Sequence, residues 1–127
     1  MPVNVPCRLG VLVSGSGTNL QAIIDRIESG EIHAEIACVI SNKADAYALT
    51  RAARHGIPVV IHENTGFPDR RSYDAATVDI LRSHTVDLVI LAGFMRILTD
   101  VMVNAFPDAI MNIHPALLPS FQGLHAQ

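Results

Sequence analysis

Cysteine is scarce in this sequence, and neither cysteine belongs to a recognisable motif. Cys7 and Cys38 are the only two among 127 residues, and they are not arranged in a CxxC pair of the redox or metal-binding kind. A secreted scaffold held together by disulfides is therefore excluded, and a Cys7–Cys38 disulfide is disfavoured because such bonds are rare inside cells. We interpret both residues as reduced, partly buried thiols and expect a cytoplasmic protein.

The sequence also lacks an excess of positive charge and any long apolar run. Its formal net charge is −3, whereas nucleic-acid binding requires a basic face. No apolar run approaches the length that spans a membrane. Residues 1–6 lack the charged start and apolar middle of a signal peptide. We therefore expect neither a nucleic-acid partner nor a membrane partner.

The residues that are present indicate one globular domain. Half of the residues are apolar and 17% are charged, and a chain of 127 residues can bury a substantial core. Strand-like runs span residues 8–13, 34–40, 58–61, 86–92 and 109–111, and helical patterns span 20–27, 45–55, 69–83 and a short stretch capped by Thr99. This alternation predicts an α/β fold with an open, mostly parallel sheet and helices on both faces.

Four polar or glycine-rich loops follow the predicted strands. They are Ser14–Asn19, Ser41–Lys43, Gly93–Leu98 and Asn112–Pro119. In open α/β sheets, ligands bind beyond the carboxyl ends of the strands, which is where all four loops are expected. The fold class therefore predicts that these loops converge on one cleft.

The first loop, Ser14–Asn19, is typical of an anion site. Its glycines let the backbone approach a ligand, and the helix that follows offers free N–H groups and the positive end of its dipole. We expect a phosphate group to bind there. NAD is disfavoured, because Leu20 occupies the place of the third small residue and Ser41-Asn42, rather than an acidic residue, ends the second strand. A tight turn with a capped helix remains an alternative.

The loop Gly93–Leu98 places apolar side chains around Arg96, an arrangement that suits a flat, partly polar ring. Equally, these apolar side chains can simply cover the core. Arg70 and Arg71 begin the third helix, where cations oppose the helix dipole. A ligand carboxylate or phosphate would explain one of them, and solvated arginines are the alternative.

Asn112 and His114 form the most informative pair. They follow a strand two residues apart, so in an extended segment both side chains point into one pocket. The carboxamide can hydrogen-bond a developing oxyanion while the imidazole moves protons, which suits chemistry at a carbonyl carbon. Metal binding by His114 and His125 is disfavoured because no third ligand has sensible spacing.

The other histidines have no catalytic context, and we expect them at the surface or at helix ends; they are His33, His55, His62 and His84. No serine or cysteine is placed beside a base, so covalent catalysis has no specific support.

Taken together, the motifs resemble the folate-dependent formyltransferases, and among them the glycinamide ribonucleotide formyltransferases of purine synthesis. The matching stretches are Val13–Ile23, Ser41–Ala46, Leu91–Leu98, Asn112–Ser120 and Gly123–His125, in the order and spacing of that family. The Asn112–Pro119 motif is shared with wider folate enzymes, whereas the first loop and Ser41–Lys43 select the purine enzymes. The fold implied is a Rossmann-like formyltransferase sheet.

The resemblance implies transfer of a formyl group from the cosubstrate 10-formyltetrahydrofolate to the amine of glycinamide ribonucleotide, without a metal. Gly17, Thr18 and Asn19 would bind the phosphate end of the ribonucleotide. Arg70, Met95, Arg96, Ile97 and Leu98 would hold the folate. Asn112 and His114 would be catalytic, with His125 beside them in the active site. A homodimer is left open.

The sequence departs from that family in length. Members supply, beyond the position of Gln127, further strands and a catalytic aspartate that is expected to pair with His114 and tune its protonation. We therefore expect residues 1–127 to be an incomplete N-terminal formyltransferase domain with little or no formyl transfer of its own. Two alternatives stay open. One is an inactive or partner-dependent fragment that binds a phosphorylated ligand, and the other is a 10-formyltetrahydrofolate hydrolase.

Overall fold

Strands and helices alternate in the computed structural model, which describes residues 5–113. The strands are β1 (Cys7–Val13), β2 (Ala34–Ser41), β3 (Val59–Ile61), β4 (Leu88–Ala92) and β5 (Ile110–Ile113). The helices are α1 (Thr18–Glu28), α2 (Tyr47–Arg54), α3 (Arg70–Ser83) and α4 (Asp100–Ala105). Every strand and helix predicted from the sequence is present, with its ends shifted by a few residues.

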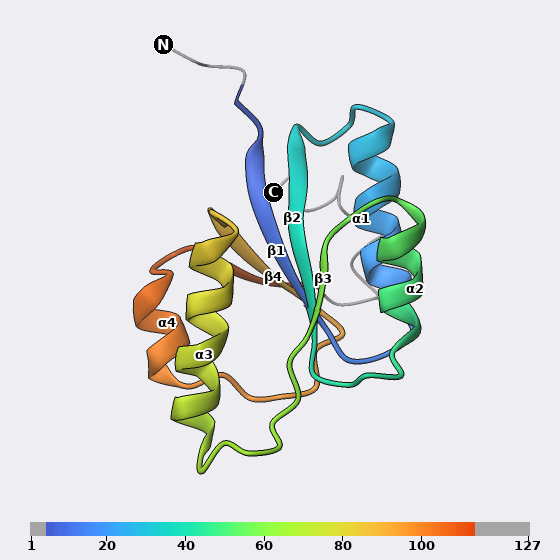
Figure 1. Cartoon of the computed structure of the whole chain (residues 1–127). Helices are drawn as coiled ribbons and strands as arrows, with labels where there is room; N and C mark the ends of the chain where they lie inside the picture. Colours follow the sequence, from blue (N-terminus) through green and yellow to red (C-terminus); the bar gives the residue numbers. More distant parts are fainter. Residues whose placement is uncertain (1–4, 114–127) are drawn as a thin grey trace.

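The five strands form one parallel sheet in the order β3-β2-β1-β4-β5 (Figure 1). The chain builds outward from β1 through β2 to β3, then crosses to the other side of β1 for β4 and β5. The direction of winding therefore reverses between β1 and β4, and ligands of open α/β sheets bind at such a reversal. The loops after β1 and β4 flank this point, at the lower end of Figure 1.

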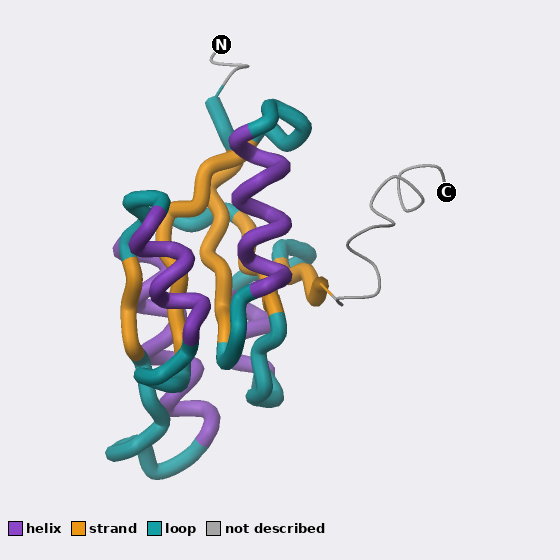
Figure 2. The backbone as a smooth tube through the Cα atoms, turned by 90° about the vertical axis from the view of Figure 1, so that its right-hand side faces the viewer, coloured by secondary structure: helices purple, strands orange, loops and turns teal. Residues whose placement is uncertain are grey.

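Helices cover both faces of the sheet, as the sequence predicts. Helices α1 and α2 lie on one face and α3 and α4 on the other (Figures 1 and 2). Side chains of β1 alternate between the two layers: Val11 and Val13 pack with α1 and α2, while Leu12 packs with α3 and α4. Burial on both faces explains why β1, β2 and β4 are apolar runs rather than alternating ones.

Helix α2 differs from the prediction in the face that it buries. The expected inward residues were Leu49, Ala52 and Ala53, but Ala53 is exposed and Ala48 is fully buried. The reason is a close approach between α2 and the start of α1. A Cβ atom on Gly17 would lie 2.6 Å from the Cα of Ala48, so only small residues fit at this crossing.

The prediction for His62 is also wrong, because this residue is buried rather than on the surface. Its ring stacks on Tyr73 with centroids 4.2 Å apart, and the edge of Phe67 meets it at 5.2 Å. The position follows β3 directly, where a polar residue gives no sign of an aromatic partner eleven positions later. His55 and His84 lie at the ends of α2 and α3, as expected.

The thiols of Cys7 and Cys38 are free, and Cys38 is buried in the core. Burial raises the pKa of Cys38 to about 11, and burial also raises the pKa of Cys7 above its usual value. Both cysteines are therefore neutral thiols at physiological pH. Among residues 5–113, no helix is both long and apolar enough to cross a bilayer.

Candidate functional site

The first loop joins β1 to α1 and ends at Gly17, which has a left-handed backbone with φ of 79°. No side chain caps the helix, so the N–H groups of its first turn have no partner within the helix or from a cap. Thr18 and Asn19 lie in this turn, and the sequence analysis assigns both to phosphate binding. An uncapped helix start next to glycines is the geometry that anions favour.

Two carbonyl groups of the same loop are hydrogen-bonded to helix α2. The oxygen of Gly15 accepts from the N–H of Ala48 at 3.0 Å, and that of Ser16 accepts from Nε of Arg51 at 2.7 Å. Helix α2 therefore occupies acceptors that would repel an anion. It also brings the positive charge of Arg51 to the back of the loop, which further favours a negatively charged guest.

The loop after β4 exposes large apolar side chains. Met95 is 76% exposed and Ile97 is 72% exposed, so these two residues do not cover the core. The alternative that the apolar side chains of this loop cover the core is therefore wrong for this pair but holds for Phe94, which is partly buried and packs against the core. Exposed apolar groups on both sides of Arg96 leave a surface on which a flat ring can lie.

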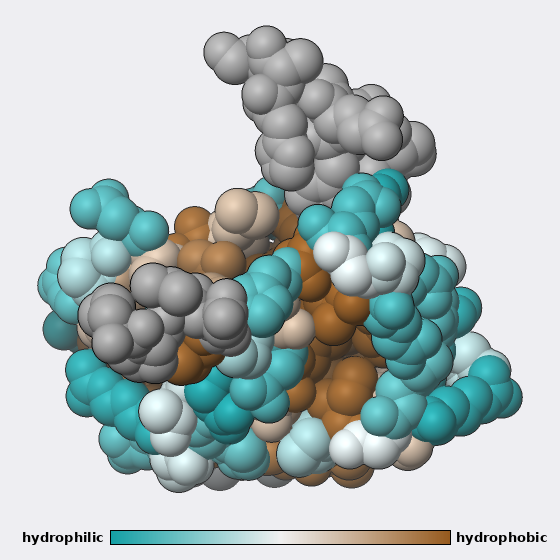
Figure 3. Space-filling model, turned by 90° about the horizontal axis from the view of Figure 1, so that it is seen from above, coloured by the Kyte–Doolittle hydropathy of each residue, from teal (hydrophilic) through white to brown (hydrophobic). Residues whose placement is uncertain are grey.

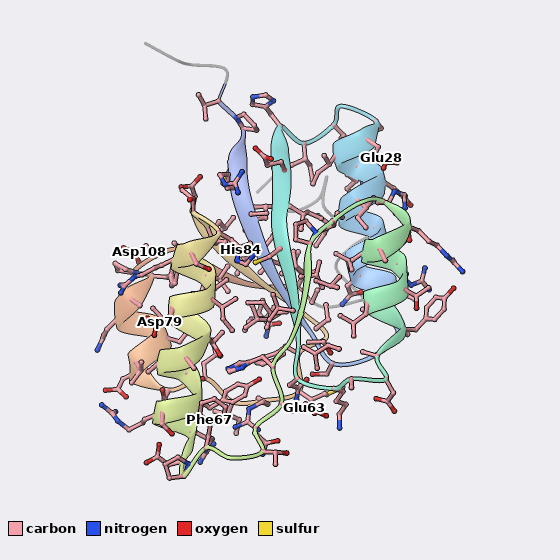
Figure 4. The ribbon with its side chains drawn as sticks, in the orientation of Figure 1. Glu28, Glu63, Phe67, Asp79, His84 and Asp108 are labelled. Atoms are coloured by element: carbon pink, nitrogen blue, oxygen red, sulfur yellow. The ribbon has the colours of Figure 1, made fainter. Side chains whose placement is uncertain are left out.

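The side chain of Arg96 packs on an aromatic cluster formed by Tyr73, His62 and Phe67. Its guanidinium lies 4.3 Å from the centroid of Tyr73, which is a favourable cation–π distance. The Tyr73 hydroxyl donates to the carbonyl of His62, and burial raises the pKa of Tyr73 to about 12. Tyr73 therefore stays neutral and remains a donor. Phe67 packs edge-on against Tyr73 at 5.4 Å and lies at the lower end of Figure 4, where the strands end.

A buried carboxylate closes the loop at its other end. Asp74 of α3 is 3% exposed and accepts from both the N–H and the hydroxyl of Thr99, each at 2.7 Å. Thr99 also caps α4 by accepting from Val101 N, as the sequence predicts for this residue. Asp74 thus links α3 to the start of α4 and fixes where the loop ends.

The two arginines at the start of α3 have different surroundings. Arg71 pairs with Asp100 of α4, so its charge is already balanced. Arg70 is exposed, and within residues 5–113 its side chain has no ion pair or hydrogen-bond partner. Of the two, Arg70 is the one that remains available for a ligand carboxylate, as the sequence analysis assigned it.

Ser14 lies where three of the loops meet. It is 4% exposed, its hydroxyl donates to Oδ1 of Asn42 at 2.6 Å, and the same oxygen accepts from the N–H of Met95 at 2.8 Å. The loops after β1, β2 and β4 are therefore bonded to one another through a single side chain. Their convergence is what the sequence predicted from the fold class.

Asn112 lies in β5, exposed, and pairs in register with Leu91 of β4. The neighbouring carbonyl of Ile113 accepts from Nδ2 of Asn19 at 3.3 Å, so the start of α1 is bonded to the end of β5. Asn19 is buried, and its Oδ1 has no partner among the described residues. The side-chain amide of Asn19 is therefore used within the protein, leaving its backbone N–H for an anion. His114 and His125 lie outside the described residues.

Two hollows lie away from these loops. One, of about 400 Å³, lies between α1, β2 and the segment after α2, with Glu28 and His55 forming an ion pair at its rim. The other, of about 510 Å³, is a groove over β1, β4 and β5 lined by Leu9, Ile90 and Met111 among others. Figure 3 looks onto the amino ends of the strands and shows brown apolar side chains exposed between polar rims.

Comparison with known proteins shows the family of this chain. The model of the formyl transferase family matches residues 7–127, which is nearly the whole chain. The chain belongs to the formyl transferase family. The family expected from the motifs is thereby confirmed.

Two similar curated proteins carry the same name. The chain is 51% identical to phosphoribosylglycinamide formyltransferase of Haemophilus influenzae over 118 residues, covering 93% of the chain and 56% of the relative. It is 44% identical to the Escherichia coli protein of the same name, covering 91% of the chain and 54% of that relative. The chain thus spans about half the length of these curated relatives.

The fold is confirmed by solved structures as well. Glycinamide ribonucleotide transformylase 1 from Symbiobacterium toebii superposes with a TM-score of 0.84 at 47% identity, covering 95% of the chain and 60% of that structure. The parallel sheet with helices on both faces is therefore that of the transformylases.

Sequence reasoning missed three residues that hold the loops in place: Ser14, Tyr73 and Asp74. The sequence analysis grouped Ser14 with the glycine loop and Tyr73 with the apolar stripe of a helix. The contacts of Ser14 and Asp74 join positions 25 to 81 residues apart, so no local pattern reports them. The available signal was the pair Tyr73-Asp74 on the buried side of α3, because a carboxylate there needs a hydrogen-bond partner.

Proposed function

We propose that this chain forms the ribonucleotide-binding and folate-binding part of an enzyme that transfers a formyl group from 10-formyltetrahydrofolate to glycinamide ribonucleotide. The observation that supports the proposal most directly is the junction at Ser14, which bonds the anion loop to the exposed loop Met95–Leu98. Membership of the formyl transferase family and the names of the relatives agree with it. The two free thiols are consistent with a cytoplasmic location, which we propose as well.

In this proposal, the N–H groups of Gly17, Thr18 and Asn19 hold the phosphate of the ribonucleotide. The pteridine ring of the folate lies against Met95, Ile97 and the backbone of the same loop, with Arg96 and Leu98 as neighbours. Arg70 neutralises a folate carboxylate at the surface. The two substrates then meet beside the end of β5, where Asn112 lies.

The reaction joins the amine nitrogen of the ribonucleotide to the formyl carbon. Attack places a negative charge on the formyl oxygen, and Asn112 donates a hydrogen bond to that oxygen. The bond between the formyl carbon and N10 of the folate then breaks, and the proton lost by the amine is delivered to N10. We assign this proton movement to His114, with His125 nearby. The substrate supplies the nucleophile, so no serine or cysteine is required.

Formyl transfer tests the proposal when the rest of the enzyme is supplied. We define the hybrid protein as residues 1–127 joined to the part of the Haemophilus influenzae relative that the chain does not cover. The hybrid protein is expected to convert 10-formyltetrahydrofolate and glycinamide ribonucleotide into tetrahydrofolate and formylated product. The chain alone is expected to give little or no product, because it spans only 56% of that relative.

Two results would favour the alternatives. Release of formate from 10-formyltetrahydrofolate without any amine acceptor would indicate a hydrolase. Binding of the ribonucleotide without any effect of folate, and without product in the hybrid protein, would indicate a module that binds phosphorylated ligands only. Either result would contradict formyl transfer as the function of this site.

A further inference from the structure

The buried hydroxyl of Ser14 connects three loops by hydrogen bonds. It is 4% exposed and makes two hydrogen bonds, to Oδ1 of Asn42 at 2.6 Å and from the N–H of Met95 at 2.8 Å. A serine hydroxyl has one proton to give. Because that proton is directed at Asn42, a lone pair of the oxygen faces Met95. Asn42 therefore sets the direction in which Ser14 accepts.

The loop that Ser14 contacts is held in part by its side chains, because Phe94 and Leu98 pack against the core and Arg96 lies over the ring of Tyr73. Met95 and Ile97 are 76% and 72% exposed, so burial of their side chains does not fix the backbone between them. Two buried polar groups hold its ends. Ser14 accepts from the N–H of Met95, and Asp74 accepts from the N–H of Thr99 at 2.7 Å. These two hydrogen bonds hold the backbone of the loop at Met95 and at Thr99.

We propose that Ser14 is a positioning residue that sets the folate-binding loop against the phosphate-binding loop. This inference rests on the proposed function, in which Met95–Leu98 holds the folate and Gly17–Asn19 holds the ribonucleotide. Ser14 begins the phosphate-binding loop, and its hydroxyl accepts a hydrogen bond from the backbone N–H of Met95 in the folate-binding loop. Neither ligand needs to touch it. Its effect is to fix the distance between the two half-sites, on which alignment of the amine with the formyl carbon depends.

The test uses the 127-residue chain and measures the Met95 anchor without any ligand. In Ser14→Ala, exchange of the Met95 amide hydrogen is expected to become about 10-fold faster or more, since its acceptor is gone. The amides of Val11 and Leu12 in β1 are the internal reference and are expected to keep their protection. Binding of tetrahydrofolate, measured by calorimetry, is expected to weaken about 5-fold or more.

A matched pair at position 42 separates positioning from simple packing. Asn42→Asp keeps an acceptor for the Ser14 proton and is expected to retain tetrahydrofolate affinity within about 2-fold. Asn42→Ala removes that acceptor and is expected to weaken binding in the same direction as Ser14→Ala. Only Asn42→Asp keeps a side-chain oxygen, so a difference in tetrahydrofolate affinity between the two variants reports the acceptor for the Ser14 proton.

Three results would overturn the inference. The first is unchanged protection of Met95 in Ser14→Ala, and the second is loss of protection in β1 together with Met95. The third is an Asn42→Asp variant that binds as weakly as Asn42→Ala. If the unaltered chain does not bind tetrahydrofolate at all, the folate part of the proposed function fails instead. Exchange at Met95 still decides whether Ser14 anchors the loop.

Discussion

At the scale of single residues, Asn112 carries the chemical part of the proposal. It lies exposed on β5, beside the hydrogen bond from Asn19 to the carbonyl of Ile113. Its backbone is held by pairing with β4 and by the bond at the next residue, while its side chain is exposed. A carboxamide in that setting can donate a hydrogen bond to a developing oxyanion without a large reorganisation of its surroundings.

Replacing Asn112 tests this role. In the hybrid protein, Asn112→Ala is expected to lower kcat for formyl transfer by about 10²-fold, because one donor to the oxyanion is lost. The KM for the ribonucleotide is expected to change little, since the phosphate lies at another loop. The free energy of unfolding is expected to stay within about 0.5 kcal/mol, as for other exposed positions. A rise in KM with an unchanged kcat would contradict an oxyanion role.

Cys38 makes a prediction about stability at high pH. Burial raises its pKa from 9.0 to about 11, so the unfolded chain loses this proton before the folded chain does. The associated stability is complete below pH 9 and is lost as the pH rises towards 11. The loss amounts to at most about 2–3 kcal/mol. Tyr73, whose pKa burial raises to about 12, extends the loss further.

Urea unfolding at several pH values measures this effect. Cys38→Ala is expected to be less stable at pH 7, because it leaves a small cavity of about 1 kcal/mol in cost. Its stability is nevertheless expected to fall less between pH 9 and 11 than that of the unaltered chain. Cys7→Ala serves as the control, since Cys7 is only partly buried. Parallel pH curves for the Cys38→Ala variant and the unaltered chain would contradict the assignment.

At the scale of elements, the crossing of α1 and α2 depends on Gly17. This residue has φ of 79°, and a Cβ there would lie 2.6 Å from the Cα of Ala48. Gly17→Ala is therefore expected to cost about 2 kcal/mol or more, from backbone strain and overlap together. Gly15→Ala is the control, because nothing lies within 4 Å of its Cβ position. Thermal unfolding of both variants measures the difference, and equal effects would contradict the account of this crossing.

The link between α3 and α4 gives a second prediction at this scale. Asp74→Ala removes the acceptor for two groups of Thr99 and is expected to cost about 2–3 kcal/mol. Thr99→Val removes the hydroxyl, with its bond to Asp74 and its cap on Val101, but keeps the bond from the Thr99 N–H, so its cost is expected to be smaller, about 1 kcal/mol. Denaturant unfolding that ranks Thr99→Val as the more damaging change would show that Asp74 is not the anchor.

The elements themselves were largely predictable from the sequence. Apolar runs predicted the strands and apolar periodicity predicted the longer helices, because most of them bury an apolar face in the core, and the cap at Thr99 predicted the short helix α4. The errors fell where a neighbour in space decides the outcome. Ala48 rather than Ala53 is buried because Gly17 lets α1 come close, and His62 is buried because Tyr73 stacks on it. Neither neighbour is close in sequence.

At the scale of the whole molecule, the fold class predicted which loops meet but not what joins them. Parallel strands place their carboxyl ends together, so the cluster of loops followed from the alternation of elements. The bonds of Ser14 to Asn42 and Met95 depend on the register of β1 against β2 and β4. That register is set by the packed sheet as a whole. A residue such as Ser14 therefore becomes recognisable only in the assembled structure.

The most direct test of the central claim is a nuclear magnetic resonance titration of the labelled 127-residue chain with each substrate in turn. Glycinamide ribonucleotide is expected to shift the amide signals of Gly17, Thr18 and Asn19, and tetrahydrofolate those of Met95–Leu98. The two ligands together are expected to shift Asn112 as well. Shifts confined to the hollow near Glu28 and His55, or no shift with either ligand, would contradict the claim that these loops form the substrate site.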